Sequence, residues 1–274
     1  MEKMIGECLE ANALREMFKS LEHVKIVGDV CIDNFAKNHL TVYRYMHYRW
    51  AEELILSKKV AFQNPQKWED PFERRFACGD YKAVGFAPKQ MACLCVTTEH
   101  GENEAAFWRS FDPEVNRDMV QLTLDFGALL KALDDFAREH NAMVYVEACD
   151  YSYTSEDLKS SGKNSFLKDV QGLDDNTFIK MMGLKRRAFK YEKELRFIIY
   201  GDNLPFDGDF VKVPYLGKLV RTLKISPYPD TGAFPLADNI ATALRDFYKE
   251  KNVAIRIERS HLYDKVSNFK LKGK

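Results

Sequence analysis

Residues 190–200, KYEKELRFIIY, decide how this chain is interpreted. Successive side chains of a β-strand point to opposite faces of the sheet. As a strand, the stretch would place three apolar residues on one face: Leu195, Phe197 and Ile199. The other face would carry Glu192, Glu194 and Arg196 in one row before it becomes apolar at Ile198. The apolar face predicts a core position, whereas the charged row requires an explanation of its own.

The charged row is costly unless something offsets it. Two carboxylates about 5 Å apart repel by about 3 kcal/mol at an effective dielectric near 20, which corresponds to about two pKa units. On an exposed face, water screens this repulsion and cross-strand ion pairs are worth little. In a cleft, Arg196, a ligand or another cation has to balance the charge. A solvated face and a functional site with perturbed charges therefore both stay open.

The composition is that of a globular protein without a strong overall charge. The chain has 274 residues, of which 46% are hydrophobic, so it can bury a sizeable core. The 41 lysines and arginines equal the 41 aspartates and glutamates, so no global positive field attracts nucleic acid. One local basic run could still form a patch or a solvated helix end. It comprises Lys185, Arg186, Arg187 and Lys190.

Cysteine, histidine and apolar patterns point to a cytoplasmic protein without a structural metal. The six cysteines lie far apart and form no CxxC pair, which is typical of a reduced compartment. The six histidines match no zinc-binding spacing, and no metal is expected. No apolar run approaches the roughly 18 residues of a membrane span, and the first residues lack the apolar run of a signal peptide.

Two parts of the chain differ in pattern. Residues 1–40 are expected to form an N-terminal helical extension that caps the core or binds a partner, because residues 7–23 repeat apolar residues at helical spacing. Residues 41–274 mix β-branched strand patterns with amphipathic helices in no strict alternation. They predict a single α+β domain with a mixed, largely antiparallel sheet and flanking helices.

Two segments carry strong local signals. Asp70, Pro71 and Glu73 suit the N-cap, the first turn and the reciprocal capping-box position of a helix. Residues 152–175 are polar and rich in turn residues, which predicts a mobile loop.

Three polar islands interrupt apolar strands. They are Arg44 within TVYRYMH, the pair Thr97 and Thr98 at the end of MACLCVTT, and the Glu192–Arg196 row. An arginine on a core strand is costly unless a carboxylate or a phosphate pairs with it. Arg44 is therefore expected either in an internal ion pair or at the anionic group of a ligand.

In this order, an arginine strand, a Ser/Thr strand and a Glu-x-Glu strand resemble the arginine–serine–glutamate class of ADP-ribosyltransferases. The resemblance implies that Arg44 contacts the pyrophosphate or nicotinamide ribose of NAD and that Thr97 braces the site. It also implies that Glu194 binds the ribose 2′-hydroxyl and that Glu192 orients the nucleophile. Val-Thr-Thr stands where the class has Ser-Thr-Ser.

The residue types suit the reaction that this resemblance implies. Breaking the nicotinamide–ribose bond develops positive charge on the sugar, which a preorganised carboxylate stabilises. A cation is needed at the pyrophosphate, and Tyr43, Tyr45 or Tyr191 could stack on nicotinamide. The predicted NAD-binding set comprises Arg44, Tyr45, Thr97, Thr98, Tyr191 and Arg196, beside the predicted catalytic residues Glu192 and Glu194.

A second resemblance covers residues 41–265. VYRYMHYRW, WEDPFE, CLCVTT and KYEKELRFI resemble motifs of the bacterial domain-of-unknown-function-2971 family, with Glu69 where that family has Asn. This implies a divergent transferase acting as a toxin or anti-phage effector on protein or nucleic acid, with an antitoxin as its partner. A non-enzymatic RNA- or protein-binding module is one alternative. The other is a magnesium-dependent nuclease using Asp70, Glu73, Glu192 and Glu194.

Overall fold

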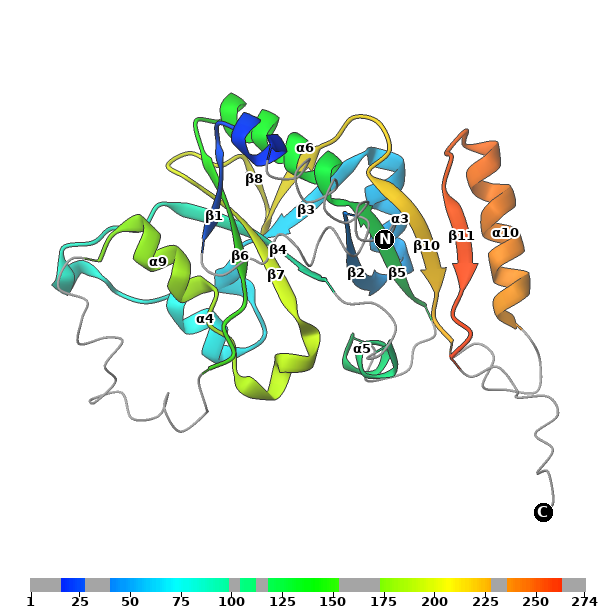
Figure 1. Ribbon diagram of the computed structural model, residues 1–274, viewed down its shortest axis with the longest axis horizontal. Coiled ribbons are helices and arrows are strands. Elements are labelled where there is room, and N and C mark those ends of the chain that lie inside the picture. Colours follow the sequence, from blue (N-terminus) through cyan, green and yellow to red (C-terminus); the bar gives the residue numbers. More distant parts are fainter. Residues whose placement is uncertain are drawn as a thin grey trace, which may run out of the picture.

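The computed structural model describes residues 16–27, 40–98, 104–111, 118–152, 173–227 and 236–262 (Figure 1). The predicted helix at 29–38 and nearly all of the predicted loop at 152–175 lie outside these residues. Within them, β-strands and α-helices are mixed along the chain, as the sequence predicts.

One large sheet organises the structure. The strands of its main path lie in the order β1-β6-β7-β4-β2-β5-β10-β11, and a branch of β3, β9 and β8 joins at β4. The pairs β1–β6 and β10–β11 are parallel, and the other pairs are antiparallel. This confirms the predicted mixed, largely antiparallel sheet. The strands are β1 (Val24–Val27), β2 (Thr41–His47), β3 (Lys59–Gln63), β4 (Gln90–Thr97), β5 (Met119–Asp125), β6 (Met143–Ala148), β7 (Glu194–Gly201), β8 (Phe206–Asp207), β9 (Phe210–Pro214), β10 (Val220–Ile225) and β11 (Arg256–Arg259).

Helices cover both faces of the sheet (Figure 1). The larger hydrophobic core contains residues of α3, α6 and α10, and a second core on the other side contains residues of α4 and α9. The α-helices are α3 (Tyr48–Ser57), α4 (Pro71–Ala77), α5 (Glu104–Phe111), α6 (Phe126–Glu139), α9 (Asp175–Met182) and α10 (Leu236–Glu250). The 3₁₀ helices are η1 (Pro65–Lys67), η2 (Lys82–Val84) and η3 (Arg187–Glu192).

Strand β7 lies between the two cores and is buried along its whole length. The three residues predicted to share an apolar face belong to the larger core, namely Leu195, Phe197 and Ile199. The alternate residues Ile198 and Tyr200 belong to the second core. The strand alternation therefore directs Glu194 and Arg196 to the side on which α4 and α9 pack.

Two segments differ from the sequence prediction. Within residues 1–40, residues 16–20 are helical, but β1 pairs with β6 and extends the main sheet, because Val24, Ile26 and Val27 favour a strand. The strand predicted from residue 190 begins only at Glu194, and Glu192 ends the 3₁₀ helix η3. Lys193 separates the two elements in a left-handed conformation with φ 42°, which breaks the strand.

Candidate functional site

The three polar islands lie on neighbouring strands at the centre of the sheet. In the sheet, β4 lies between β7 and β2. The register pairs Thr97 of β4 with Glu194 of β7 on one side and with Tyr43 of β2 on the other. Directly paired residues point to the same face of a sheet. The strand alternation and the register therefore bring the threonine island beside the glutamate island.

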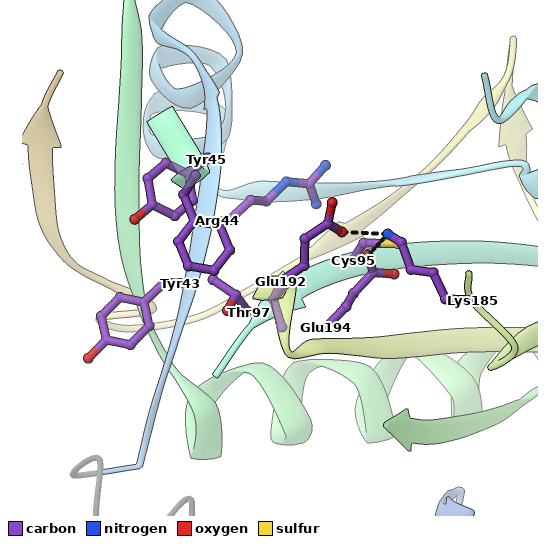
Figure 2. A pocket seen from close by; sticks show the side chains of 10 residues that line it. Tyr43, Arg44, Tyr45, Cys95, Thr97, Lys185, Glu192 and Glu194 are labelled. Atoms are coloured by element: carbon purple, nitrogen blue, oxygen red, sulfur yellow. Dashed lines mark hydrogen bonds and ion pairs between the residues drawn. The ribbon is translucent and has the colours of Figure 1, made fainter. Parts of the chain in front are cut away.

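Arg44 reaches the site because the sheet opens between β2 and β4. Strand β2 pairs with β5 along its whole length, but its register with β4 contains a single pair, Tyr43 with Thr97. A cavity of ≈ 140 Å³ lies at this opening (Figure 2). Its lining residues are Tyr43, Arg44, Tyr45, Cys95, Val96, Thr97, Phe107, Lys185, Glu192 and Glu194. Arg44 and both glutamates therefore face one space.

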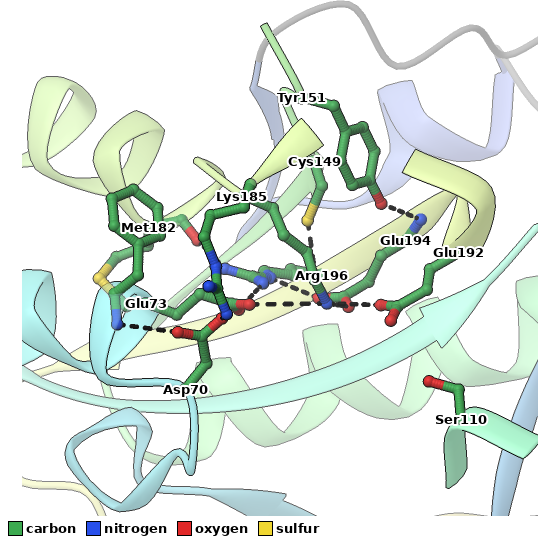
Figure 3. A network of polar contacts seen from close by, with 12 residues as sticks. Asp70, Glu73, Ser110, Cys149, Tyr151, Met182, Lys185, Glu192, Glu194 and Arg196 are labelled. Atoms are coloured by element: carbon green, nitrogen blue, oxygen red, sulfur yellow. Dashed lines mark hydrogen bonds and ion pairs between the residues drawn. The ribbon is translucent and has the colours of Figure 1, made fainter. Parts of the chain in front are cut away.

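A buried network of charges lies beside this cavity (Figure 3), and Lys185, Glu192 and Glu194 belong to both. Lys185 Nζ donates to Glu192 Oε2 and to Glu194 Oε2, in both cases at 2.5 Å. Arg196 Nε donates to Glu194 Oε1 at 2.6 Å, and its two Nη atoms bind Glu73 and the Met182 carbonyl. The network thus joins α4, the segment after α9, the end of η3 and β7.

The pKa values of the two site carboxylates are shifted in opposite directions. Burial opposes ionisation of Glu194, but Arg196 and Lys185 outweigh it and hold its pKa below the usual 4.5. For Glu192, burial outweighs the attraction of Lys185 and raises the pKa above 4.5. Burial alone would lower the pKa of Lys185. The attraction of Glu194 and Glu73 outweighs burial, so the pKa of Lys185 lies above its usual value. A firmly ionised carboxylate and one of higher basicity therefore share one cation.

Arg44 does not belong to the network. Its Nη1 is buried and has no hydrogen-bond partner among the described residues. Figure 2 shows its guanidinium and the carboxylate of Glu192 pointing into the same space. Burial lowers the pKa of Arg44, although Cys95 opposes this shift. A buried donor without a partner costs about 1–3 kcal/mol, and an acceptor on a ligand would recover that cost.

The remaining predicted NAD-binding residues have internal contacts. Tyr45 lines the cavity, but its ring stacks on Phe107 and its hydroxyl accepts a hydrogen bond from Gln121. The hydroxyls of Tyr191 and Ser110 are hydrogen-bonded at 3.0 Å. Neither Tyr191 nor Thr98 nor Arg196 lines the cavity.

Thr98 lies at the mouth of the site rather than in it. Its backbone N–H and its hydroxyl both donate to the carbonyl of Lys193. These bonds connect the end of β4 to the residue between η3 and β7. Thr98 therefore holds the backbone beside the two glutamates in place.

Sequence reasoning missed two members of the network, Lys185 and Glu73. Lys185 was grouped with surface cations, but it is buried among three carboxylates. Asp70 caps α4 as predicted by accepting from the Phe72 N–H, but the carboxylate of Glu73 pairs with Arg196. Helical spacing gives one signal, because Glu73 shares the buried face of α4 with Phe76.

A metal site of the kind a nuclease needs is not found in the described part of the chain. No group of three or more His, Cys, Asp or Glu residues is arranged there to hold a metal ion. In the same part of the chain, no helix combines the length and apolarity needed to cross a membrane. Asp70, a metal ligand in the predicted nuclease, instead forms an ion pair with Arg186, with 2.7 Å between Oδ2 and Nη2.

Comparison with known proteins gives only remote similarities. No family model matches the chain, and neither does any curated protein sequence. The structure is similar to that of Thermus sp. 2.9 DarT in complex with ADP-ribosylated ssDNA, with 8% identity, a TM-score of 0.34, and coverage of 81% of this chain and 94% of DarT. The structure of Thermus sp. 2.9 DarT in complex with NAD⁺ is similar with 9% identity and a TM-score of 0.31, and the match covers 81% of this chain and 95% of DarT. At these TM-scores the likeness is remote, and the activity of DarT is not carried over to this chain.

Proposed function

We propose that the chain is an NAD-dependent mono-ADP-ribosyltransferase and that the cavity between β2 and β4 receives the nicotinamide ribose of NAD. Arg44, which lines the same cavity as Glu192 and Glu194, carries this proposal, because its buried Nη1 has no hydrogen-bond partner among the residues that the structure describes. A guanidinium in this state suits a phosphate oxygen, and a pair of carboxylates suits a sugar that gains positive charge.

The reaction breaks the bond between ribose C1′ and the pyridine nitrogen. Nicotinamide leaves with the bonding electron pair as a neutral molecule, and positive charge develops on the ribose ring. A nucleophilic oxygen or nitrogen of the acceptor then bonds to C1′ and releases a proton. Glu192 is the candidate for accepting that proton, because its raised pKa makes it the more basic of the two site carboxylates.

Glu194 is suited to bind the ribose 2′-hydroxyl. A carboxylate offers about four lone-pair positions. Among the described residues, Lys185, Arg196 and the more distant Cys149 thiol donate to Glu194. Glu194 also lines the cavity, so a ribose hydroxyl bound there would approach it from the side away from Arg196. Under this proposal Arg196 and Lys185 position Glu194 and keep it ionised, and Thr97 braces it from the neighbouring strand.

The cavity limits how much of NAD is enclosed. Pockets that enclose a whole drug-sized ligand usually measure about 300–1,000 Å³, and this cavity measures ≈ 140 Å³. We therefore assign it to the nicotinamide ribose end only. The adenosine end would lie outside the cavity, and Arg44 would contact the pyrophosphate between them.

Glu194→Gln tests this function. We expect wild type to release nicotinamide from NAD and the variant to lose about 100-fold or more of that rate, since one electrostatic contact in such a site is worth about this much. Asp134→Asn is the matched control, because it makes the same change to a buried carboxylate on α6, away from the cavity. Equal rates for wild type and Glu194→Gln would refute the proposal.

The closed charge network favours a second candidate, a non-enzymatic binding module. The glutamate row is satisfied internally, although by Lys185 and Arg196 rather than by Arg44. This candidate predicts ligand binding that depends on Arg44, without release of nicotinamide from NAD. Binding and turnover measured on the same preparations separate the two functions.

The proposed biological role is that of a bacterial toxin or anti-phage effector. The residues predicted to bind an antitoxin lie mostly outside the described part of the chain. Expression of wild type should arrest growth of a bacterial host, and expression of Glu194→Gln at equal level should not. Growth arrest by both would separate toxicity from the proposed chemistry.

A further inference from the structure

The 3₁₀ helix η3 carries a row of cations next to the candidate site. A 3₁₀ helix has three residues per turn, so side chains three positions apart lie above one another. Arg187 and Lys190 are spaced in this way, and both are exposed. With a rise of about 2 Å per residue, the side chains of this row lie about 6 Å apart.

A neighbouring face of η3 is anchored to the wall of the cavity. Phe189 lies against the cations of Lys185 and Arg186, at 5.4 and 5.0 Å from its ring centre. Glu192 lines the cavity and binds Lys185. Because one short helix carries both Glu192 and the cation row, anything bound along the row lies beside the cavity.

The positive charge of the row is not needed inside the protein. The buried network contains three carboxylates and two cations, and Arg44 beside it supplies a third cation. In the described part of the chain, neither Arg187 nor Lys190 forms an ion pair. Since lysines plus arginines equal aspartates plus glutamates in the whole chain, this row is a local surplus on a neutral protein.

We infer that the acceptor is a single-stranded nucleic acid whose phosphates lie along Arg187 and Lys190; its role as acceptor rests on the proposed function. Two cations about 6 Å apart on one face suit successive phosphates of such a strand. Under the proposed function this cavity holds the nicotinamide ribose, so the acceptor has to bring a nucleophilic atom to it from the side of η3. A base inside a duplex is stacked and presents its ring atoms there only after it is extruded, whereas an unpaired base presents them directly.

Fluorescence anisotropy with labelled DNA and RNA single strands of mixed sequence tests this inference. The strands are about 20 nucleotides long, and the salt concentration is varied from about 50 mM upward. The test variant is Arg187→Glu/Lys190→Glu. The control variant, Lys82→Glu/Lys218→Glu, makes the same charge change at exposed positions outside η3 and the cavity lining. Circular dichroism melting establishes that both variants fold.

We expect wild type and the control to bind single strands within twofold of one another, and the η3 variant to bind about tenfold or more weakly at low salt. The salt dependence of the η3 variant should also be shallower by about 1.4 logarithmic units per logarithmic unit of salt, since two phosphate contacts are lost. A preference for DNA or RNA identifies the sugar of the acceptor and supports the inference equally.

Three outcomes would overturn the inference: no strand binding at low salt, unchanged binding by the η3 variant, or equally effective competition by polyglutamate. The last would identify a site for acidic polypeptides. Nicotinamide release is measured on the same preparations. Strand binding without turnover would reject the transferase but keep the nucleic-acid site, whereas turnover without strand binding would reject only the nucleic-acid site.

Discussion

Arg44 and Arg196 lie on the two strands that flank β4, and both are buried, but their surroundings differ. Arg196 binds Glu73, Glu194 and the Met182 carbonyl, so each of its three nitrogens has an acceptor. Arg44 has a buried Nη1 with no acceptor among the described residues. The arginine on β7, Arg196, therefore stabilises the fold through its hydrogen bonds, whereas the arginine on β2, Arg44, lines a cavity where a ligand can reach it.

The difference shows which charges are available to a ligand. A buried ion pair balances its desolvation cost only when its hydrogen bonds are complete, and the network around Arg196 meets that condition. The described residues offer no acceptor to Nη1 of Arg44, so they do not offset the cost of burying this donor. The glutamates lie between these extremes, because Lys185 and Arg196 bind them on the network side while the cavity is open on the other.

The largest expected effect is on stability, and it separates the two arginines. Arg196→Met should lower the free energy of unfolding by about 3–5 kcal/mol, because it leaves the buried carboxylates Glu73 and Glu194 to share Lys185 with Glu192. Arg44→Met should not lower it and should raise it by about 1–3 kcal/mol, because it removes a buried donor that has no acceptor among the described residues. Urea unfolding of both variants at neutral pH checks this. Equal losses would show that Arg44 also has a structural partner.

The next effect concerns ligand binding. Arg44→Met should weaken binding of NAD by about 10- to 100-fold, since hydrogen bonds to charged groups are worth about 1.5–3 kcal/mol. Arg44→Lys should lose less, because it keeps the charge but not the planar fork of donors. Isothermal titration calorimetry gives both dissociation constants. Wild-type affinity in Arg44→Met would remove the guanidinium from the ligand site.

The sequence predicted the central strands because their residues are informative on their own. TVYRYMH and ELRFIIYG combine β-branched and aromatic residues, and the alternation in ELRFIIYG correctly assigned Leu195 and Phe197 to one core. The start of α4 was equally readable, because Asp70 and Pro71 fix a helix N-terminus by local chemistry.

The network was not readable, because its contacts are distant in sequence. Arg196 and Glu73 are 123 positions apart, and no local pattern brings them together. The role of Glu192 depends on a break at Lys193, whose positive φ is uncommon for a residue with a Cβ and has no signal in the sequence. The sequence predicted Glu192 and Glu194 on one strand face. In the structure Glu192 ends the helix η3, Glu194 begins the strand β7, and both bind Lys185.

The dependence of stability on pH sharpens the contrast between the two glutamates. The lowered pKa of Glu194 contributes stability that is complete above pH 4.5 and is lost as the pH falls through its folded pKa. The raised pKa of Glu192 contributes stability that is complete below pH 4.5 and is lost as the pH rises through its folded pKa. The two groups therefore act in opposite directions.

Replacing each glutamate by Gln should show these opposite signs. Relative to wild type, Glu192→Gln should gain stability as the pH rises above about 4.5, by at most about 1.4 kcal/mol per pH unit. The deficit of Glu194→Gln should stay constant over that range and narrow below it. Urea unfolding at closely spaced pH values checks both curves, and parallel curves would mean that the two carboxylates share one environment.

The smallest expected effect tests how far the network depends on the element that supports it. Asp70 caps α4 and pairs with Arg186, so it joins the helix that carries Glu73 to the segment that carries Lys185. Asp70→Ala should cost about 1 kcal/mol, as loss of a cap does. Asp70→Asn keeps the capping oxygen and loses only a partly exposed ion pair, so its cost should be a few tenths of a kcal/mol. If Asp70→Asn instead cost as much as Asp70→Ala, the pair with Arg186 would hold the network together more than the cap does.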